Sequence, residues 1–169
     1  MRVLAHRCDF KNLEGLELAP IASIVQSGVV AITGRRQMRP KSRIDAARGG
    51  YARMVGVPVL DHCQDYNLVG NGGQRGRMEH ALGLSGWPAA GEEAMVMRNI
   101  LLAELCDHRI HCQHISAAGS VRANSRSAGT GVKISGEVCP HHIALDGCRH
   151  SEFRYQLQDE PAVADASGH

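Results

Sequence analysis

The chain has 169 residues, of which 43% are hydrophobic, 21% charged and 4% aromatic, and its formal net charge is +2 at pH 7. This composition is typical of one globular domain with a sizeable core, and it excludes a disordered chain. The small net charge gives no strong attraction for nucleic acid or for an anionic membrane surface. No apolar run approaches the ~20 residues that a membrane span needs. We therefore expect a cytoplasmic protein that binds neither nucleic acid nor a membrane.

Six cysteines could suggest disulfides, but the chain is too long and too rich in core residues to be a small disulfide-stapled domain. Its first residues, MRVLAHRCDF, do not resemble a signal peptide. We expect reduced thiols. No CxxC pair occurs, which argues against a thiol redox site or a zinc ribbon.

Short apolar runs alternate with helical patterns along most of the chain. Pro20 suits the start of a helix and Gly28 suits its end. Gly49 and Gly50 weaken a later helix, each by roughly 1 kcal/mol relative to Ala. The runs predict strands at residues 2–5, 29–33, 57–63, 109–115 and 132–139. The patterns between them predict helices at residues 17–28, 41–56, 90–106 and 118–131.

The clearest helix is predicted at residues 90–106, with acidic residues in its first turn. Its spacing predicts an apolar face made of Ala94, Met97, Ile100, Leu101 and Leu105. The next helix is a poorer one, because Asn124 and Ser125 stand where apolar residues would help.

A strand–helix series of this kind predicts an α/β fold with a parallel sheet. We expect one unit over residues 1–150 and an irregular tail over residues 151–169. In such folds the chemistry lies at the carboxyl ends of the strands. His62 and His114 each stand at such an end, where a shared pocket is expected.

His62 and His114 are the first candidates for a metal site, because neutral imidazoles on rigid strand ends can converge on one zinc ion. Cys63, Cys112, Cys139 and the pair His141–His142 are possible neighbours. The alternative is that the two histidines are ordinary polar residues hydrogen-bonded to nearby backbone, and spacing alone slightly favours that alternative.

The sequence PHH at residues 140–142 follows the last predicted strand. His141 and His142 could contact substrate in the same pocket, or they could lie in a solvent-facing turn; the residues leave both open. The glycine-rich loop GNGGQRG lacks the features of a phosphate loop or a dinucleotide fingerprint, so we expect a flexible loop over a strand end.

Four stretches in order resemble the bacterial class of dihydroorotases within the amidohydrolase superfamily. They are VPVLDHCQD, ALGLSGWPAAGEEAMVMRNILLAEL, RIHCQHISAAGSV and EVCPHHIAL. The resemblance runs from about residue 2 to residue 145. Hydantoinases and allantoinases share the barrel and the histidine positions, but these stretches are more similar to dihydroorotase.

The resemblance implies a partial (β/α)₈ TIM barrel that holds barrel strands three to seven. It implies zinc as cofactor, with His62 and His114 as metal ligands at the ends of the fifth and sixth barrel strands. It also implies the interconversion of dihydroorotate and N-carbamoyl-L-aspartate in pyrimidine biosynthesis. Zinc there activates a water and polarises the ring amide carbonyl.

Several parts of the family's site have no counterpart in these 169 residues. They are the His-x-His pair of the first strand, the substrate-binding Arg after it, and the catalytic Asp of the eighth strand. The family's carboxylate after the fourth strand is replaced by Arg35 and Arg36. The general base is therefore unassigned, and a partial barrel would leave open edges that favour self-association.

The resemblance leads to two hypotheses. In the first, the chain is a dihydroorotase whose missing groups come from another chain, for example in a homo-oligomer. In the second, it is a non-catalytic dihydroorotase remnant or an assembly partner of aspartate carbamoyltransferase.

Overall fold

The computed structural model describes residues 4–11, 17–34, 42–69 and 87–144. Five parallel strands form one sheet in the order β1-β2-β3-β4-β5, so each strand pairs with the next one along the chain. The strands are His6–Cys8, Ala31–Thr33, Val59–His62, Ile110–Gln113 and Ile134–Gly136. This α/β order is the one expected for consecutive strands of a (β/α)₈ barrel.

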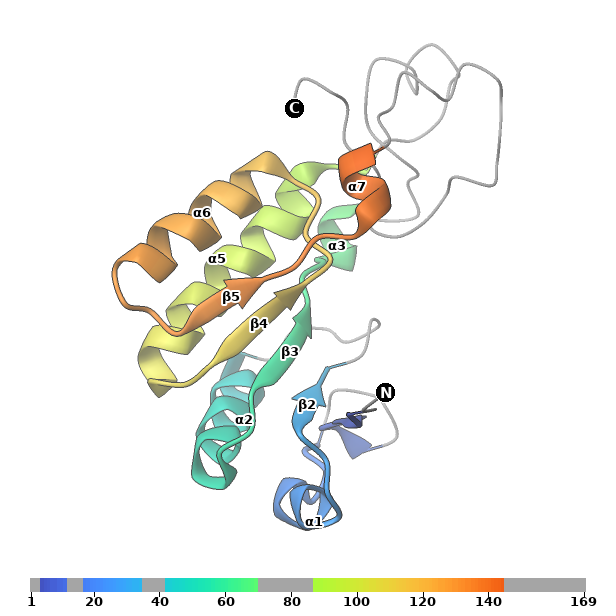
Figure 1. Ribbon diagram of the computed structural model, residues 1–169, viewed down its shortest axis with the longest axis vertical. Helices are drawn as coiled ribbons and strands as arrows, with labels where there is room; N and C mark the ends of the chain where they lie inside the picture. Colours follow the sequence, from blue (N-terminus) through green and yellow to red (C-terminus); the bar gives the residue numbers. More distant parts are fainter. Residues whose placement is uncertain (1–3, 12–16, 35–41, 70–86, 145–169) are drawn as a thin grey trace.

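Helices connect the strands, and α2, α5 and α6 lie side by side along one side of the sheet (Figure 1). The helices are α1 Ile21–Gln26, α2 Ser42–Val55, α3 Tyr66–Val69, α5 Ala89–Cys106, α6 Ala118–Gly129 and α7 Pro140–Ala144. The strands run toward α3 and α7, which therefore lie at the carboxyl end of the sheet (Figure 1). None of the helices in the described segments is long and apolar enough to cross a membrane.

The core lies between the sheet and these helices. Along β3 and β4 the residues alternate between buried and half-buried. The buried set faces the helices and includes Val59 and Ile110, whereas the half-buried set, with Leu60 and Gln113, lies on the opposite face. A period of two of this kind is what a strand produces when one of its faces is more fully covered than the other.

The strands are shorter than predicted, and the first is displaced. We expected it at residues 2–5, but Leu4 and Ala5 precede it and Leu4 is 70% exposed. The paired segment is His6–Cys8. The buried residues at this edge of the sheet are Asp9 and Phe10, which follow that segment, whereas Leu4 and Ala5 before it are exposed. Pairing and burial in the tertiary structure, and not local apolarity, therefore set the position of this strand.

Helix ends follow the predicted signals more closely. Pro20 stands immediately before α1, and Gly28 follows its end with φ +94°, a conformation that favours glycine. The predicted apolar face of α5 is wrong for all but one of its residues. Ile100 is buried, but Ala94, Met97, Leu101 and Leu105 are exposed. Apolar residues occur on most sides of this helix, so periodicity alone did not select the buried stripe, which includes Met95, Val96, Asn99 and Ala103.

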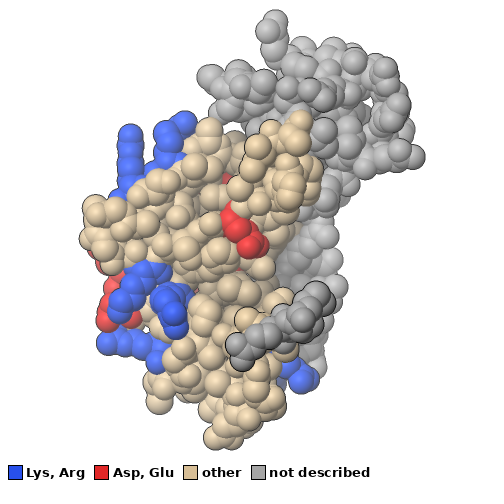
Figure 2. All heavy atoms as spheres, in the orientation of Figure 1, with Lys and Arg blue, Asp and Glu red and all other residues tan. Residues whose placement is uncertain are grey.

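Basic and acidic side chains lie beside one another along the left edge of the surface shown in Figure 2, and a further acidic patch lies near its middle, while most of the described surface in this view carries neither charge. Asp107, which is 57% exposed, pairs with Lys133 at 2.6 Å and with Arg53 at 3.3 Å. A hydrogen bond from Lys133 lowers the pKa of the Asp107 carboxyl. The five cysteines in the described segments form no disulfide with one another.

Candidate active site

The two predicted metal-site histidines come together at the carboxyl end of the sheet. His62 is the last residue of β3, and the register pairs it with Gln113, the residue before His114. The Nδ1 atom of His62 lies 2.8 Å from the Nε2 atom of His114, and the ring centroids are 4.5 Å apart. Adjacent parallel strands therefore place both imidazoles at one point, as the strand-end argument predicts.

The backbone at His114 is unusual, because this residue has φ +38°. Residues other than glycine rarely adopt this left-handed conformation, which costs roughly 1–3 kcal/mol when the surrounding structure imposes it. Here it turns the chain directly after β4. The turn brings the His114 ring beside His62.

Glu92 holds the segment that follows His114. Its buried carboxylate, in the first turn of α5, accepts hydrogen bonds from the backbone N–H and hydroxyl of Ser116 and from the backbone N–H of Ala117. Ala117 stands immediately before α6 and its own side chain caps nothing. A carboxylate from the neighbouring helix thus satisfies N–H groups at the start of α6, and it fixes the chain two residues beyond His114.

Tyr66 is the second partner of His62. The Tyr66 hydroxyl lies 2.8 Å from the Nε2 atom of His62, and its ring meets Trp87 edge-on at a centroid distance of 6.4 Å. When the Nε2 atom of His62 carries the ring proton and donates it in a hydrogen bond to the Tyr66 hydroxyl, the Nδ1 atom of His62 is unprotonated. Its lone pair then points toward His114. Tyr66, at the start of the short helix α3, and Trp87, two residues before α5, were not predicted, because a single aromatic residue in such a position gives no periodic or spacing signal.

On the other face of β3, a buried charge network lies directly behind His62. We define this network as Asp9, Asp45, Arg48, Asp61, Arg98 and Asn99. Asp61, the neighbour of His62 in sequence, is bound by Arg48 at 3.0 Å and by the amide of Asn99 at 2.7 Å.

The network contains three carboxylates and two guanidinium groups. Arg48 also reaches Asp9 at 3.5 Å, and Arg98 pairs with Asp45 at 3.2 Å. Burial opposes ionisation of Asp61, yet Arg48 and Arg98 hold the pKa of that carboxyl below its ordinary value. Burial raises the pKa of Asp9 to about 6 although Arg48 opposes the rise. Because these groups bind one another behind the sheet, we assign the network to stability.

The two cysteines considered as neighbours of the metal site are on that helix-covered face as well. Cys63 is buried and accepts a hydrogen bond from Asn99 of α5 at 3.2 Å. A hydrogen bond with Cys112 and burial raise the pKa of the Cys63 thiol. The prediction that Cys63 and Cys112 adjoin His62 and His114 is therefore wrong, because strand alternation directs them to the opposite side.

His111 is also separate from the histidine pair. Its Nδ1 lies 2.9 Å from the Ser135 hydroxyl, and its Nε2 lies 3.3 Å from the carboxylate of Glu137. Those partners belong to β5 and to the residue that follows it. His111 is therefore engaged with the neighbouring strand.

The remaining predicted site residues occupy α7 or lie outside the described residues. His141 and His142 belong to the first turn of α7, beside Cys139. The predicted substitution of Arg35 and Arg36 for a carboxylate, the glycine-rich loop and the tail at 151–169 fall outside the described residues.

Sequence comparison finds dihydroorotases. The chain is 39% identical to a dihydroorotase from Pelotomaculum thermopropionicum over 136 residues, which are 80% of this chain and 32% of the relative. It is 39% identical to one from Anaeromyxobacter dehalogenans over 159 residues, which are 92% of this chain and 37% of the relative. The chain thus spans about a third of the length of these relatives. No protein-family model matches it.

Comparison with solved structures identifies the fold. An L-hydantoinase (dihydropyrimidinase) from Arthrobacter aurescens superposes with a TM-score of 0.79 at 14% identity, over 98% of this chain and 38% of that one. A D-hydantoinase from a Bacillus species superposes with a TM-score of 0.70 at 17% identity, over 88% of this chain and 35% of that one. The five-stranded parallel sheet matches part of the TIM-barrel architecture of these enzymes. Over most of its length the chain is thus similar in sequence to about a third of a dihydroorotase, and its fold matches part of the solved hydantoinase structures.

Proposed function

We propose that His62 and His114 supply two zinc ligands of a dihydroorotase active site, which interconverts dihydroorotate and N-carbamoyl-L-aspartate in pyrimidine biosynthesis. The observation that carries this proposal is the 2.8 Å separation of the His62 Nδ1 and His114 Nε2 atoms. Similarity to dihydroorotases supports the reaction class, and the strand-end position supports the site.

The pair fits one zinc ion. Two imidazole nitrogens on a tetrahedral zinc lie about 3.3 Å apart, because each Zn–N bond measures about 2.0–2.1 Å. The observed separation is slightly shorter, so a small rotation of the rings admits the metal. Without a metal, two nitrogens this close share one proton, which a zinc ion would replace. Zinc usually has three or four protein ligands, so two histidines form only part of a complete centre.

Zinc, when bound, supplies a Lewis acid that polarises a carbonyl and lowers the pKa of a water. The chain's own residues prepare its ligands. Tyr66 holds the Nε2 side of His62, which fixes the ring orientation and directs Nδ1 toward the metal position. Glu92 fixes the turn after His114. The contact of His141 and His142 with substrate, from the same end of the sheet, stays a prediction.

The metal assignment is tested by zinc stoichiometry. Purified chain is saturated with zinc, dialysed and analysed for metal content, next to His62→Ala and His114→Ala. Each variant is expected to lose one equivalent of zinc relative to the unaltered chain. His111→Ala is the matched control, because this imidazole lies on β4, three residues before His114, but contacts Ser135 and Glu137 instead. Unchanged zinc content in both His62→Ala and His114→Ala would reject the assignment.

The reaction is tested by hydrolysis of dihydroorotate with added zinc. Turnover that His62→Ala abolishes and His111→Ala preserves would support the enzyme. A folded, zinc-loaded chain without turnover would favour the second hypothesis, a non-catalytic relative. Co-sedimentation with aspartate carbamoyltransferase would then test the assembly role, and sedimentation of the chain alone would report a homo-oligomer.

A further inference from the structure

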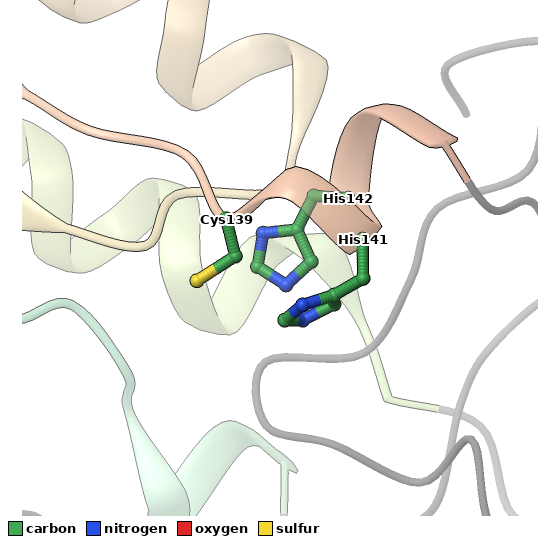
Figure 3. Close-up of side chains that lie close together, drawn as sticks. All are labelled: Cys139, His141 and His142. Atoms are coloured by element: carbon green, nitrogen blue, oxygen red, sulfur yellow. The ribbon is translucent and has the colours of Figure 1, made fainter.

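A second group of metal-binding side chains lies beyond the end of β5. Cys139, His141 and His142 bring their ligand atoms within 4.8 Å of one another. It is the one group of three or more such residues that comes this close within the described ranges. All three side chains project to the same side of the segment (Figure 3).

The local backbone explains this convergence. Pro140 occupies the first position of α7, where its missing N–H costs nothing. The backbone N–H of His142 donates to the Cys139 carbonyl at 3.0 Å, which closes the first turn. Residues three apart on a helical turn share a face, so His142 lies above Cys139, and the His141 ring meets the His142 ring edge-on at a centroid distance of 4.3 Å.

We propose that Cys139, His141 and His142 form a second transition-metal site, for which zinc is the preferred ion. A thiolate and two imidazoles are the donor set that selects zinc over magnesium or calcium. On a tetrahedral zinc the sulfur and a nitrogen would lie about 3.6 Å apart, given bonds of about 2.3 and 2.0–2.1 Å. Rotation of the two rings closes the group from its present spread to that spacing.

This donor set has consequences for α7. Three protein ligands leave one coordination position open for water or an added ligand. A five-residue helix has little stability of its own, so a metal held by its first turn and by Cys139 would fix α7 against the end of β5. The site uses none of the atoms of the His62–His114 pair. It does use the imidazoles of His141 and His142, so a metal bound there would take these two rings away from contact with substrate.

Cobalt distinguishes the two sites, because a thiolate-to-cobalt charge-transfer absorption arises only where a cysteine binds. Co²⁺ is titrated into the full chain, and zinc is then added in competition. The charge-transfer band is expected in the unaltered chain and is expected to vanish in Cys139→Ser, with loss of one metal equivalent. In His141→Ala and His142→Ala the metal affinity is expected to fall by more than about 100-fold, since even outer-shell partners contribute 10–100-fold.

Matched control variants show whether the band arises from Cys139 rather than from another thiol. Cys106→Ser and Cys8→Ser remove half-buried thiols outside the group and are expected to keep the band. His62→Ala is expected to lose the other metal equivalent and to keep the band. Circular dichroism verifies that each variant is folded.

Three results would overturn the proposal. The first is no charge-transfer band in the folded chain at saturating cobalt. The second is a charge-transfer band that persists in Cys139→Ser, or a cobalt affinity that is unchanged in both His141→Ala and His142→Ala. The third is loss of the charge-transfer band in His62→Ala. It would show that Cys139 and His62 bind the same metal ion, so that no second site exists, while His62 and His114 would remain metal ligands.

Discussion

The two faces of β3 show how one strand serves two purposes. Asp61 and His62 are consecutive, yet Asp61 is 6% exposed and held by Arg48 and Asn99, whereas His62 is half-buried and meets His114 and Tyr66. On the helix-covered face the charged groups pair with one another. On the opposite face, the imidazole nitrogens of His62 and His114 lie close together and can bind a metal.

The difference lies in how the groups are paired. A buried charge is tolerated only when opposite charges and hydrogen bonds surround it. Asp61 satisfies that condition within the described residues. The His62 and His114 nitrogens face each other, an arrangement that a shared proton or a metal ion stabilises. We therefore expect substitutions behind the sheet to alter stability, and substitutions in front of it to alter metal binding.

The largest effect is expected from Arg48→Met, which would leave Asp61 and Asp9 without their shared guanidinium in a buried site. Removing one partner of a buried ion pair costs about 3–5 kcal/mol. Urea denaturation followed by circular dichroism measures the change in the free energy of unfolding.

Arg48→Lys retains the charge but not the two-pronged geometry, and it should lose less stability than Arg48→Met. Arg53→Ala is the surface control, because Arg53 and Asp107 are both 57% exposed. Its expected loss is at most about 1 kcal/mol. Equal losses in Arg48→Met and Arg53→Ala would contradict the assignment of the buried network to stability.

The pH dependence of stability should reveal Asp9. Burial raises its pKa in the folded protein to about 6, above the ordinary 3.8, so the folded state binds this proton more tightly than the unfolded chain does. Stability from this group is therefore fully present below about pH 4 and is lost as the pH rises through 6. The loss amounts to about 3 kcal/mol, at 1.36 kcal/mol for each pKa unit.

Asp9→Asn isolates this effect from the other carboxylates. Unfolding free energies are measured by urea denaturation between pH 4 and pH 7 for both proteins. The stability of the variant relative to the unaltered chain is expected to rise by about 2.4 kcal/mol across that interval, because a small part of the effect already falls below pH 4. A difference that stays constant with pH would show that Asp9 titrates normally.

The smallest expected effect is a difference in stability between alanine substitutions at two adjacent glycines of α2. A Cβ at Gly50 would meet nothing within 4 Å, so Gly50→Ala should stabilise the helix by roughly 0.5–1 kcal/mol. A Cβ at Gly49 would lie 2.7 Å from the Cys106 Sγ and 3.2 Å from its Cβ. In Gly49→Ala, crowding of the new methyl group against α5 should cancel or reverse this gain in stability.

Thermal unfolding of the two variants makes this comparison. Gly50→Ala is expected to unfold at a higher temperature than Gly49→Ala. Equal stabilisation would mean that α5 moves away from α2 at little cost.

The sequence by itself determined the alternation of strands and helices, and with it the parallel sheet. It also indicated that His62 and His114 stand at the carboxyl ends of their strands, because the place of a residue relative to its apolar run is a local property. Helix ends at Pro20 and Gly28 were predictable for the same reason, since each residue restricts or permits its own backbone angles.

Only the tertiary structure decided which of several apolar stripes of α5 is buried, because the choice depends on how the helix is rotated against the sheet. It also gave Glu92 its partners at the start of α6 and gave Tyr66 its contact with His62. Most of these outcomes depend on distances between segments far apart in the chain. Such distances are set by packing in three dimensions, which local periodicity does not encode.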